Sequence, residues 1–111
     1  MKLNALNTIT RPETLTPGLH KVKFKEIEYI TNEADDITGY RIHIEGFAPI
    51  FGKWFDENNW ALDAFLAQLN ENSYMPAAIN KHAGTEITVE MKQNGQYLNA
   101  NFRISRGRTY R

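Results

Sequence analysis

Basic and aromatic side chains recur together along this chain, in a combination suited to binding a nucleic-acid strand. Lys21 and Lys23 alternate with Val22 and Phe24, which predicts a strand with one cationic face and one apolar face. A second group places one cation among aromatic rings and consists of Phe51, Lys53, Trp54 and Phe55. Cations neutralise backbone phosphates, and aromatic rings stack on unpaired bases at about 1–3 kcal/mol per base.

Further cations and aromatic rings fall on the polar phases of other predicted strands. Tyr97 begins a strand out of phase with its apolar positions, and Arg41 and Arg103 also lie on polar phases. The last residues, 105–111, are basic and have no apolar period, so we expect a flexible tail there. The candidate nucleic-acid-binding residues are therefore Lys21, Lys23, Arg41, Phe51, Lys53, Trp54, Tyr97, Arg103, Arg106, Arg108 and Tyr110.

Each of these side chains also has an interpretation that involves no ligand. Strand phase alone does not decide whether Phe51 and Trp54 lie in the core or on an exposed platform. Lys53 shares the phase of Phe51 and Phe55, which favours that phase being outside. Outward lysines on an edge strand commonly do no more than discourage aggregation. The burial of this third strand therefore decides between the two interpretations.

No group of residues in the sequence is typical of catalysis or of a metal site. The chain contains no cysteine, and His20, His43 and His82 are scattered instead of paired at metal-ligand spacing. It also has no glycine-rich phosphate loop and no nucleophile elbow. We therefore expect a protein that is not an enzyme and that uses no metal or cofactor.

The charges of the chain are segregated along the sequence, although the formal net charge is zero. Residues 1–25 carry five Lys or Arg and one Glu, and residues 72–111 carry six Lys or Arg and two Glu. The stretch between them, 26–71, carries ten acidic residues and two basic ones. A neutral protein with this distribution can present a local basic surface, which is all that phosphate binding requires. The alternative is that most of these charges are simply solvated.

Five strands and one helix are expected to position the candidate residues. The strands are predicted at Gly18 to Ile30, Tyr40 to Glu45, Phe47 to Phe55, Glu86 to Lys92 and Tyr97 to Ile104. One apolar stripe at helical spacing predicts a helix from Asn59 to about Asn70, between the third and fourth strands. An all-β chain with one helix in this position has the layout of a five-stranded OB-fold barrel.

Several local signals refine this prediction. The apolar phase switches between Phe24 and Ile27, which predicts a β-bulge near Lys25 to Glu26. Either Asp56 or Asn58 is expected to cap the helix, and 74–84 is expected to form a loop. Asn94-Gly95 is expected to occupy both central positions of a two-residue hairpin turn.

The length of 111 residues indicates one domain. We expect a lead-in segment at 1–17, an OB-fold domain at 18–104 and the basic tail at 105–111. The sequence has no apolar run of membrane-spanning length and no signal-peptide core at its N-terminus. A cytoplasmic protein without membrane contact is therefore expected.

Two short motifs, Pro17-Gly18-Leu19-His20-Lys21-Val22 and Asp36-Ile37-Thr38-Gly39-Tyr40, accompany this order of elements. Together they resemble small single-stranded DNA-binding proteins of phages and mobile elements of Gram-positive bacteria, the lactococcal phage type among them. The resemblance implies an OB-fold that coats single strands during DNA replication or recombination, as a homodimer or higher homo-oligomer in the host cytoplasm. It also implies replication or recombination proteins as further partners.

The C-terminus departs from one pattern found among proteins of this fold. Bacterial housekeeping single-strand binders end in an acidic, phenylalanine-tipped tail that recruits partner enzymes. This chain ends in the basic run 106–111, so we expect its tail to contact nucleic acid.

The leading hypothesis is sequence-tolerant binding of single-stranded DNA. The alternative is an OB-fold protein-protein interaction module that uses the acidic loop 31–36 and the exposed face of the helix. A third hypothesis is a structural or assembly protein that forms large oligomers without nucleic acid.

Overall fold

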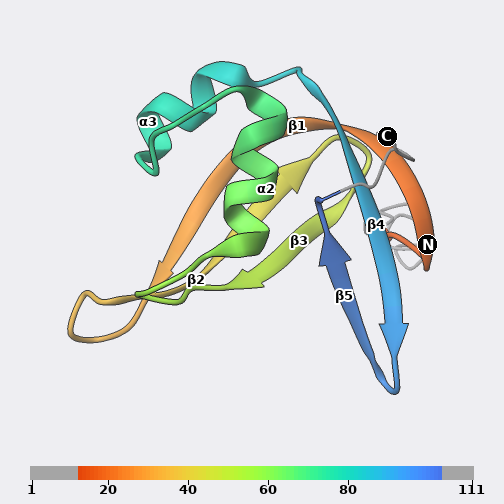
Figure 1. The fold of residues 1–111 in the computed structure, drawn as a ribbon, viewed down its shortest axis with the longest axis horizontal. Helices are drawn as coiled ribbons and strands as arrows, with labels where there is room; N and C mark the ends of the chain where they lie inside the picture. Colours follow the sequence, from red (N-terminus) through yellow and green to blue (C-terminus); the bar gives the residue numbers. More distant parts are fainter. Residues whose placement is uncertain (1–12, 104–111) are drawn as a thin grey trace, which may run out of the picture.

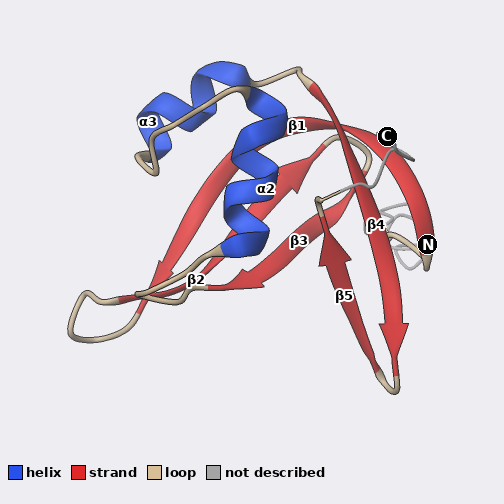
Figure 2. Ribbon diagram, in the orientation of Figure 1, coloured by secondary structure: helices blue, strands red, loops and turns tan. Residues whose placement is uncertain are grey.

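The computed structural model describes residues 13–103, which form five antiparallel strands in one sheet with few helices (Figures 1 and 2). The strands are β1 (Gly18–Thr31), β2 (Ile37–Ile44), β3 (Phe47–Lys53), β4 (Glu86–Asn94) and β5 (Tyr97–Asn101). The helical elements are α2 (Trp60–Leu69), α3 (Pro76–Ile79) and the 3₁₀ turn η1 (Asn80–His82). The mostly β fold with five strands is confirmed.

The prediction of a loop over 74–84 is wrong, because α3 and η1 lie in this stretch. Pro76 occupies the first helical position, where its fixed φ suits a helix and its missing N–H costs nothing. A helix of four residues is too short to produce an apolar period in the sequence.

The sheet has the order β3-β2-β1-β4-β5, with the long strand β1 at its centre. The first half of β1 pairs with β4, and its second half pairs with β2. A register shift between Phe24 and Glu26 separates the two halves, so the predicted β-bulge is confirmed. Figure 1 shows β1 as a strongly curved strand, which allows one strand to serve both parts of the sheet.

The two edges of the sheet, β3 and β5, are not joined by a ladder within residues 13–103. Part of the segment predicted as a lead-in packs beside β3: the Ala48 N–H donates to the Glu13 carbonyl at 3.0 Å. Leu15 follows and is only 2% exposed. It lines a hollow of about 100 Å³ together with residues of β3, β4 and β5. The sheet is therefore open at this edge, and Leu15 contributes to the core there.

The helix α2 buries its apolar stripe against the sheet. The stripe consists of Leu62, Phe65, Leu66 and Leu69, all buried as the periodicity predicts. The ring of Phe65 packs between those of Phe24 and Phe102, with centroid separations of 5.2 and 5.3 Å. Aromatic pairs at these distances add to the burial of apolar area. The stripe and its ring contacts fix α2 on the sheet.

Gln68 ties α2 to the backbone of β4 beyond the end of β5. The Thr88 N–H donates to Gln68 Oε1 at 2.7 Å, and Gln68 Nε2 donates to the carbonyls of Thr88 and Phe102 at 2.7 and 2.8 Å. The last pair of the β4–β5 ladder is Glu90 with Asn101, so Thr88 has no partner in β5. The side-chain amide of Gln68 therefore makes the hydrogen bonds to the Thr88 backbone that a neighbouring strand would otherwise make.

Gln68→Ala is expected to lower the free energy of unfolding by about 1–3 kcal/mol. The substitution leaves partly buried backbone groups of Thr88 and Phe102 without hydrogen bonds. Urea denaturation measures this change. Gln93→Ala is the matched control, since Gln93 makes its hydrogen bonds in the exposed hairpin. Equal unfolding midpoints for the two variants would contradict the anchoring role of Gln68.

The β4–β5 hairpin forms as predicted, but its turn is shifted by one residue. Asn94 pairs with Tyr97, so the two-residue loop is Gly95-Gln96, and the expected placement of Asn94 at a central position is wrong. Gly95 has φ +65° and Asn94 does not have positive φ. The physical reason is that Gly95 occupies the first central position of the turn, where a type II′ hairpin turn requires glycine.

Candidate nucleic-acid interface

One face of β2 and β3 brings Phe51, Lys53 and Phe55 of the second sequence group together with Arg41. Arg41 of β2 lies opposite Phe51 of β3, with its guanidinium 5.5 Å from the ring centroid. Lys53 Nζ lies 5.4 Å from the ring centroid of Phe55, just beyond the end of β3. We call Arg41, Phe51, Lys53 and Phe55 the basic-aromatic strip.

The strip lies on the outside of the sheet. Phe51 is 62% exposed and Phe55 is 50% exposed, whereas Ile50, of the other phase, is buried. The expectation that the phase of Phe51 and Phe55 faces outward is confirmed. Two large rings exposed beside cations offer stacking surfaces at the places where phosphates would be neutralised.

Arg41 forms an ion pair with an acidic neighbour on β1. Glu28 lies opposite Arg41 in the ladder, and their side chains form an ion pair at 3.3 Å. The same carboxylate lies 3.0 Å from His43 Nε2. Hydrogen bonding to His43 and then to Arg41 holds the pKa of Glu28 below its ordinary value. A phosphate that approaches Arg41 must therefore compete with Glu28.

Trp54 lies behind the strip in an aromatic cluster of its own. Its ring makes edge contacts with Tyr29 at 5.5 Å and Tyr74 at 5.7 Å, and it is only partly exposed. Its indole N–H donates to Asp56 Oδ1 at 3.2 Å. The hydroxyl of Tyr74 in turn donates to Asp63 on α2 at 2.5 Å. These contacts hold the loop after β3 against the body and place Trp54 in a cluster apart from the strip.

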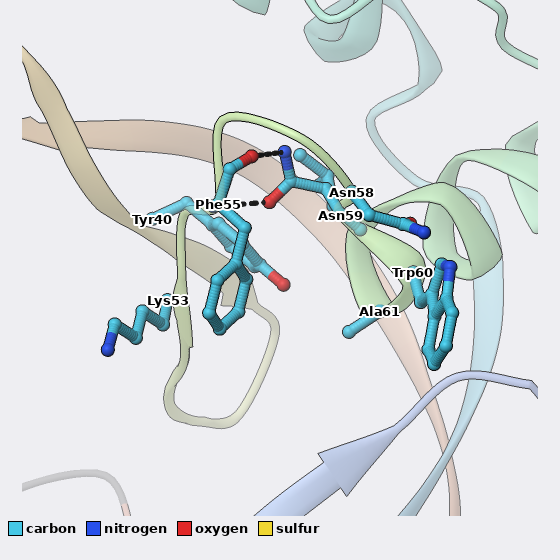
Figure 3. A pocket seen from close by; sticks show the side chains of 8 residues that line it. Tyr40, Lys53, Phe55, Asn58, Asn59, Trp60 and Ala61 are labelled. Atoms are coloured by element: carbon cyan, nitrogen blue, oxygen red, sulfur yellow. Dashed lines mark hydrogen bonds between the residues drawn. The ribbon is translucent and has the colours of Figure 1, made fainter.

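An apolar pocket of about 380 Å³ lies next to the strip, at the start of α2 (Figure 3). Its lining consists of Tyr40, Lys53, Phe55, Asn58, Asn59, Trp60, Ala61 and Leu62. Figure 3 shows the Phe55 ring between Lys53 and Trp60, with Ala61 in the space between the two rings. The Trp60 side chain is 71% exposed. The pocket therefore opens between two aromatic rings that are available to a ligand.

Asn59 fixes the position of Phe55 in this wall. The Phe55 N–H donates to Asn59 Oδ1 at 2.8 Å, and Asn59 Nδ2 donates to the Phe55 carbonyl at 2.5 Å. Asn59 is the residue before α2, and its side chain makes no capping bond to the helix. The prediction that Asp56 or Asn58 caps α2 is therefore wrong. The physical reason is that the chain turns back at Phe55. The buried Asn59 side-chain amide bonds to the backbone of Phe55 in that turn and is not available to the free N–H groups of the helix.

A second hollow of about 880 Å³ lies between α2 and the strands β1 and β4. It brings together two predicted residues, Lys21 and Arg103, with Trp60, which also lines the first pocket. Asp63 and Glu86 line it as well, so its charge is mixed. Trp60 thus borders both hollows.

The other predicted residues lie apart from the strip or outside the described part of the chain. Lys23 is exposed on β1 opposite Glu86 of β4. Tyr97 is 66% exposed at the turn of the β4–β5 hairpin, at the end of the hairpin that points away from α2 (Figure 1). Three more predicted residues lie outside the described residues, namely Arg106, Arg108 and Tyr110.

The candidate binding residues drawn from the sequence include neither Trp60 nor Phe55, although Phe55 belongs to the second sequence group. One signal was available for Trp60, because it falls outside the apolar stripe of the helix while carrying a large ring. The corresponding signal for Phe55 was its shared phase with Lys53. The positions of the Trp60 and Phe55 rings depend on where the chain turns after β3, and the sequence pattern does not define that turn.

Two kinds of site are absent from the part of the chain that the structure describes. No group of three or more His, Asp or Glu side chains within 13–103 is placed to hold a metal ion. No helix in the same range is long and apolar enough to cross a membrane.

Comparison with protein-family models, with curated proteins and with solved structures finds no match to this chain.

Proposed function

We propose that this protein binds single-stranded DNA without strong sequence preference through the basic-aromatic strip, and that it has no catalytic role. The observation that carries the proposal is the pairing of two exposed rings with two cations on one face of the sheet. Bases would stack on Phe51 and Phe55, and phosphates would contact Arg41 and Lys53. Stacking tolerates any base, because every base has a π-face.

The strand order supports an OB-fold barrel as the finer description of the fold. The bulged central strand β1, the order β3-β2-β1-β4-β5 and the position of α2 between β3 and β4 in the chain all fit this architecture. In an OB-fold the face of the second and third strands commonly binds oligonucleotides, and the strip lies on this face. Together with the sequence resemblance, this favours a role in coating single strands during phage or mobile-element replication or recombination, as a homo-oligomer.

The proposal is tested by titrating the protein with a fluorescein-labelled oligo-dT at low salt and at about 0.3 M salt. We expect tight binding at low salt and a steep loss of affinity at the higher concentration, because phosphate contacts release counterions. Duplex DNA of the same length is expected to bind more weakly, since its bases are not available for stacking. Absence of oligo-dT binding at low salt would overturn the proposal.

That negative outcome would favour a protein-interaction module instead. The mixed charge of the second hollow and the exposed ring of Trp60 are the features suited to such a partner.

Glu28→Gln is expected to strengthen oligo-dT binding by up to about fivefold at low salt. The substitution removes the carboxylate that competes with phosphate for Arg41. Fluorescence anisotropy measures the change, and the gain should shrink as salt is raised. Glu90→Gln in β4 is the control, because it changes the net charge equally on a strand that β1 separates from β2 and β3 in the sheet. An equal gain in both variants would show a general charge effect and contradict the specific role of Glu28.

A further inference from the structure

We infer that the pocket between Phe55 and Trp60 receives one unpaired base of the bound strand, which is flipped out of the stack that the neighbouring bases form. This inference deepens the proposed function and rests on it. It assigns a role to Trp60 and Tyr40, neither of which belongs to the strip.

The shape of the pocket fits a single planar ring. Its volume of about 380 Å³ falls near the lower end of the range for small-molecule sites. The rings of Phe55 and Trp60 lie on either side of the space above Ala61 (Figure 3). Leu62, from the buried stripe of α2, completes an apolar lining. An inserted base would contact aromatic surface as it does in a nucleic-acid stack.

A buried hydroxyl group provides a polar contact in this apolar site. Tyr40 is 2% exposed and lines the pocket, and Figure 3 shows its hydroxyl oxygen beside the Phe55 ring, on the side of Ala61. This hydroxyl makes no hydrogen bond with any residue in the range 13–103. A buried polar group without a protein partner is costly, and a ligand that bonds to it removes that cost.

Gly52 allows the Tyr40 ring to take this position. The two residues are paired across β2 and β3, and a Cβ atom on Gly52 would lie 2.1 Å from Tyr40 Cζ. The ring therefore lies directly across the glycine. Its hydroxyl reaches the pocket because the facing strand carries no side chain at that position.

The hydroxyl is expected to act as a hydrogen-bond donor to the base. Burial, and then the nearby Asp63 carboxylate, raise the pKa of Tyr40 to about 12, so it remains protonated at neutral pH. The acceptors available to it are the carbonyl oxygens of thymine and the ring nitrogens of adenine, so the hydroxyl can bond to either base. We therefore expect the pocket to strengthen binding of oligo-dT and of oligo-dA alike.

The position of Lys53 connects the pocket to the strip. Lys53 lines the pocket and lies over the opposite side of Phe55 from Trp60. A phosphate held at Lys53 would place the adjacent sugar near the mouth of the pocket. A base in a duplex cannot enter the pocket without unpairing, so the pocket would also favour single strands over duplexes.

The test measures binding of fluorescein-labelled oligo-dT and oligo-dA to wild type, Trp60→Ala, Trp60→Phe and Tyr40→Phe at fixed low salt. Trp60→Ala is expected to weaken oligo-dT binding about tenfold, and Trp60→Phe less, because a ring is retained. Tyr40→Phe is expected to weaken binding of oligo-dT and of oligo-dA about three- to tenfold, because the variant keeps the ring and loses the hydrogen-bond donor. The ring of Tyr40 still covers Gly52 in this variant, and circular dichroism verifies the fold.

Phe51→Ala separates failure of the pocket from failure of the proposed function. If Phe51→Ala weakens binding while Trp60→Ala and Tyr40→Phe bind like wild type, the proposed base pocket is contradicted and the proposed binding along the strip is supported. If wild type binds neither oligonucleotide, the proposed function and the pocket are overturned together.

Discussion

The double substitution Phe51→Ala and Phe55→Ala is expected to weaken binding of oligo-dT by about 30-fold or more. Each ring provides a stacking surface for a base, and stacked bases contribute about 1–3 kcal/mol each. Each ring also lies beside a cation, Arg41 or Lys53, whose position it helps to define. Anisotropy titrations at a single low salt concentration measure the loss.

The fold of this double variant is expected to persist, because both rings are at least half exposed. Tyr97→Ala is the comparison variant: it removes a similarly exposed ring from the β4–β5 hairpin, another candidate binding residue, and a site centred on the strip predicts the smaller loss there. Loss of binding in the Tyr97 variant, with normal binding in the double variant, would move the site from the strip to the hairpin.

Leu15→Ala is expected to lower the free energy of unfolding by about 2–5 kcal/mol. Leu15 is 2% exposed and lies at the hollow between β3 and β5, the two edges that no ladder joins within 13–103. Truncation would remove buried apolar area and enlarge this hollow, and both effects destabilise the fold. Urea denaturation of the full chain measures the difference from wild type.

Thr16→Ala is the control for the Leu15 variant, since Thr16 is exposed and only its backbone carbonyl accepts the bond from His20. Its unfolding midpoint should remain near that of wild type. Equal midpoints for the Leu15 and Thr16 variants would contradict the assignment of Leu15 to the core.

Periodicity in the sequence was sufficient to predict most of the sheet and the main helix. The alternation in β1 and its change of phase predicted both the strand and the bulge between Phe24 and Glu26. The apolar spacing predicted the buried stripe of α2, and Lys53 gave the correct outward phase for Phe51. These features depend on local repeats of two or 3.6 residues, which a single sequence displays directly.

Features that depend on contacts between distant segments were not predictable. Trp54 and Trp60 are six positions apart, yet one packs against Tyr29 and the other is largely exposed. The difference arises because the chain turns back at Phe55, where Asn59 satisfies the backbone. The role of Leu15 depends on an edge of the sheet formed by distant strands. No local sequence pattern indicates the turn at Phe55 or the packing of Leu15 at the sheet edge.

The central claim, that a single strand lies along the basic-aromatic strip, is tested most directly by mapping oligo-dT onto ¹⁵N-labelled protein by NMR. If the strand lies there, the largest amide shifts fall at Arg41, Phe51, Lys53 and Phe55, and the indole N–H of Trp60 shifts with them. Shifts confined to the β4–β5 hairpin, or to the exposed side of α2 away from Trp60, would contradict it.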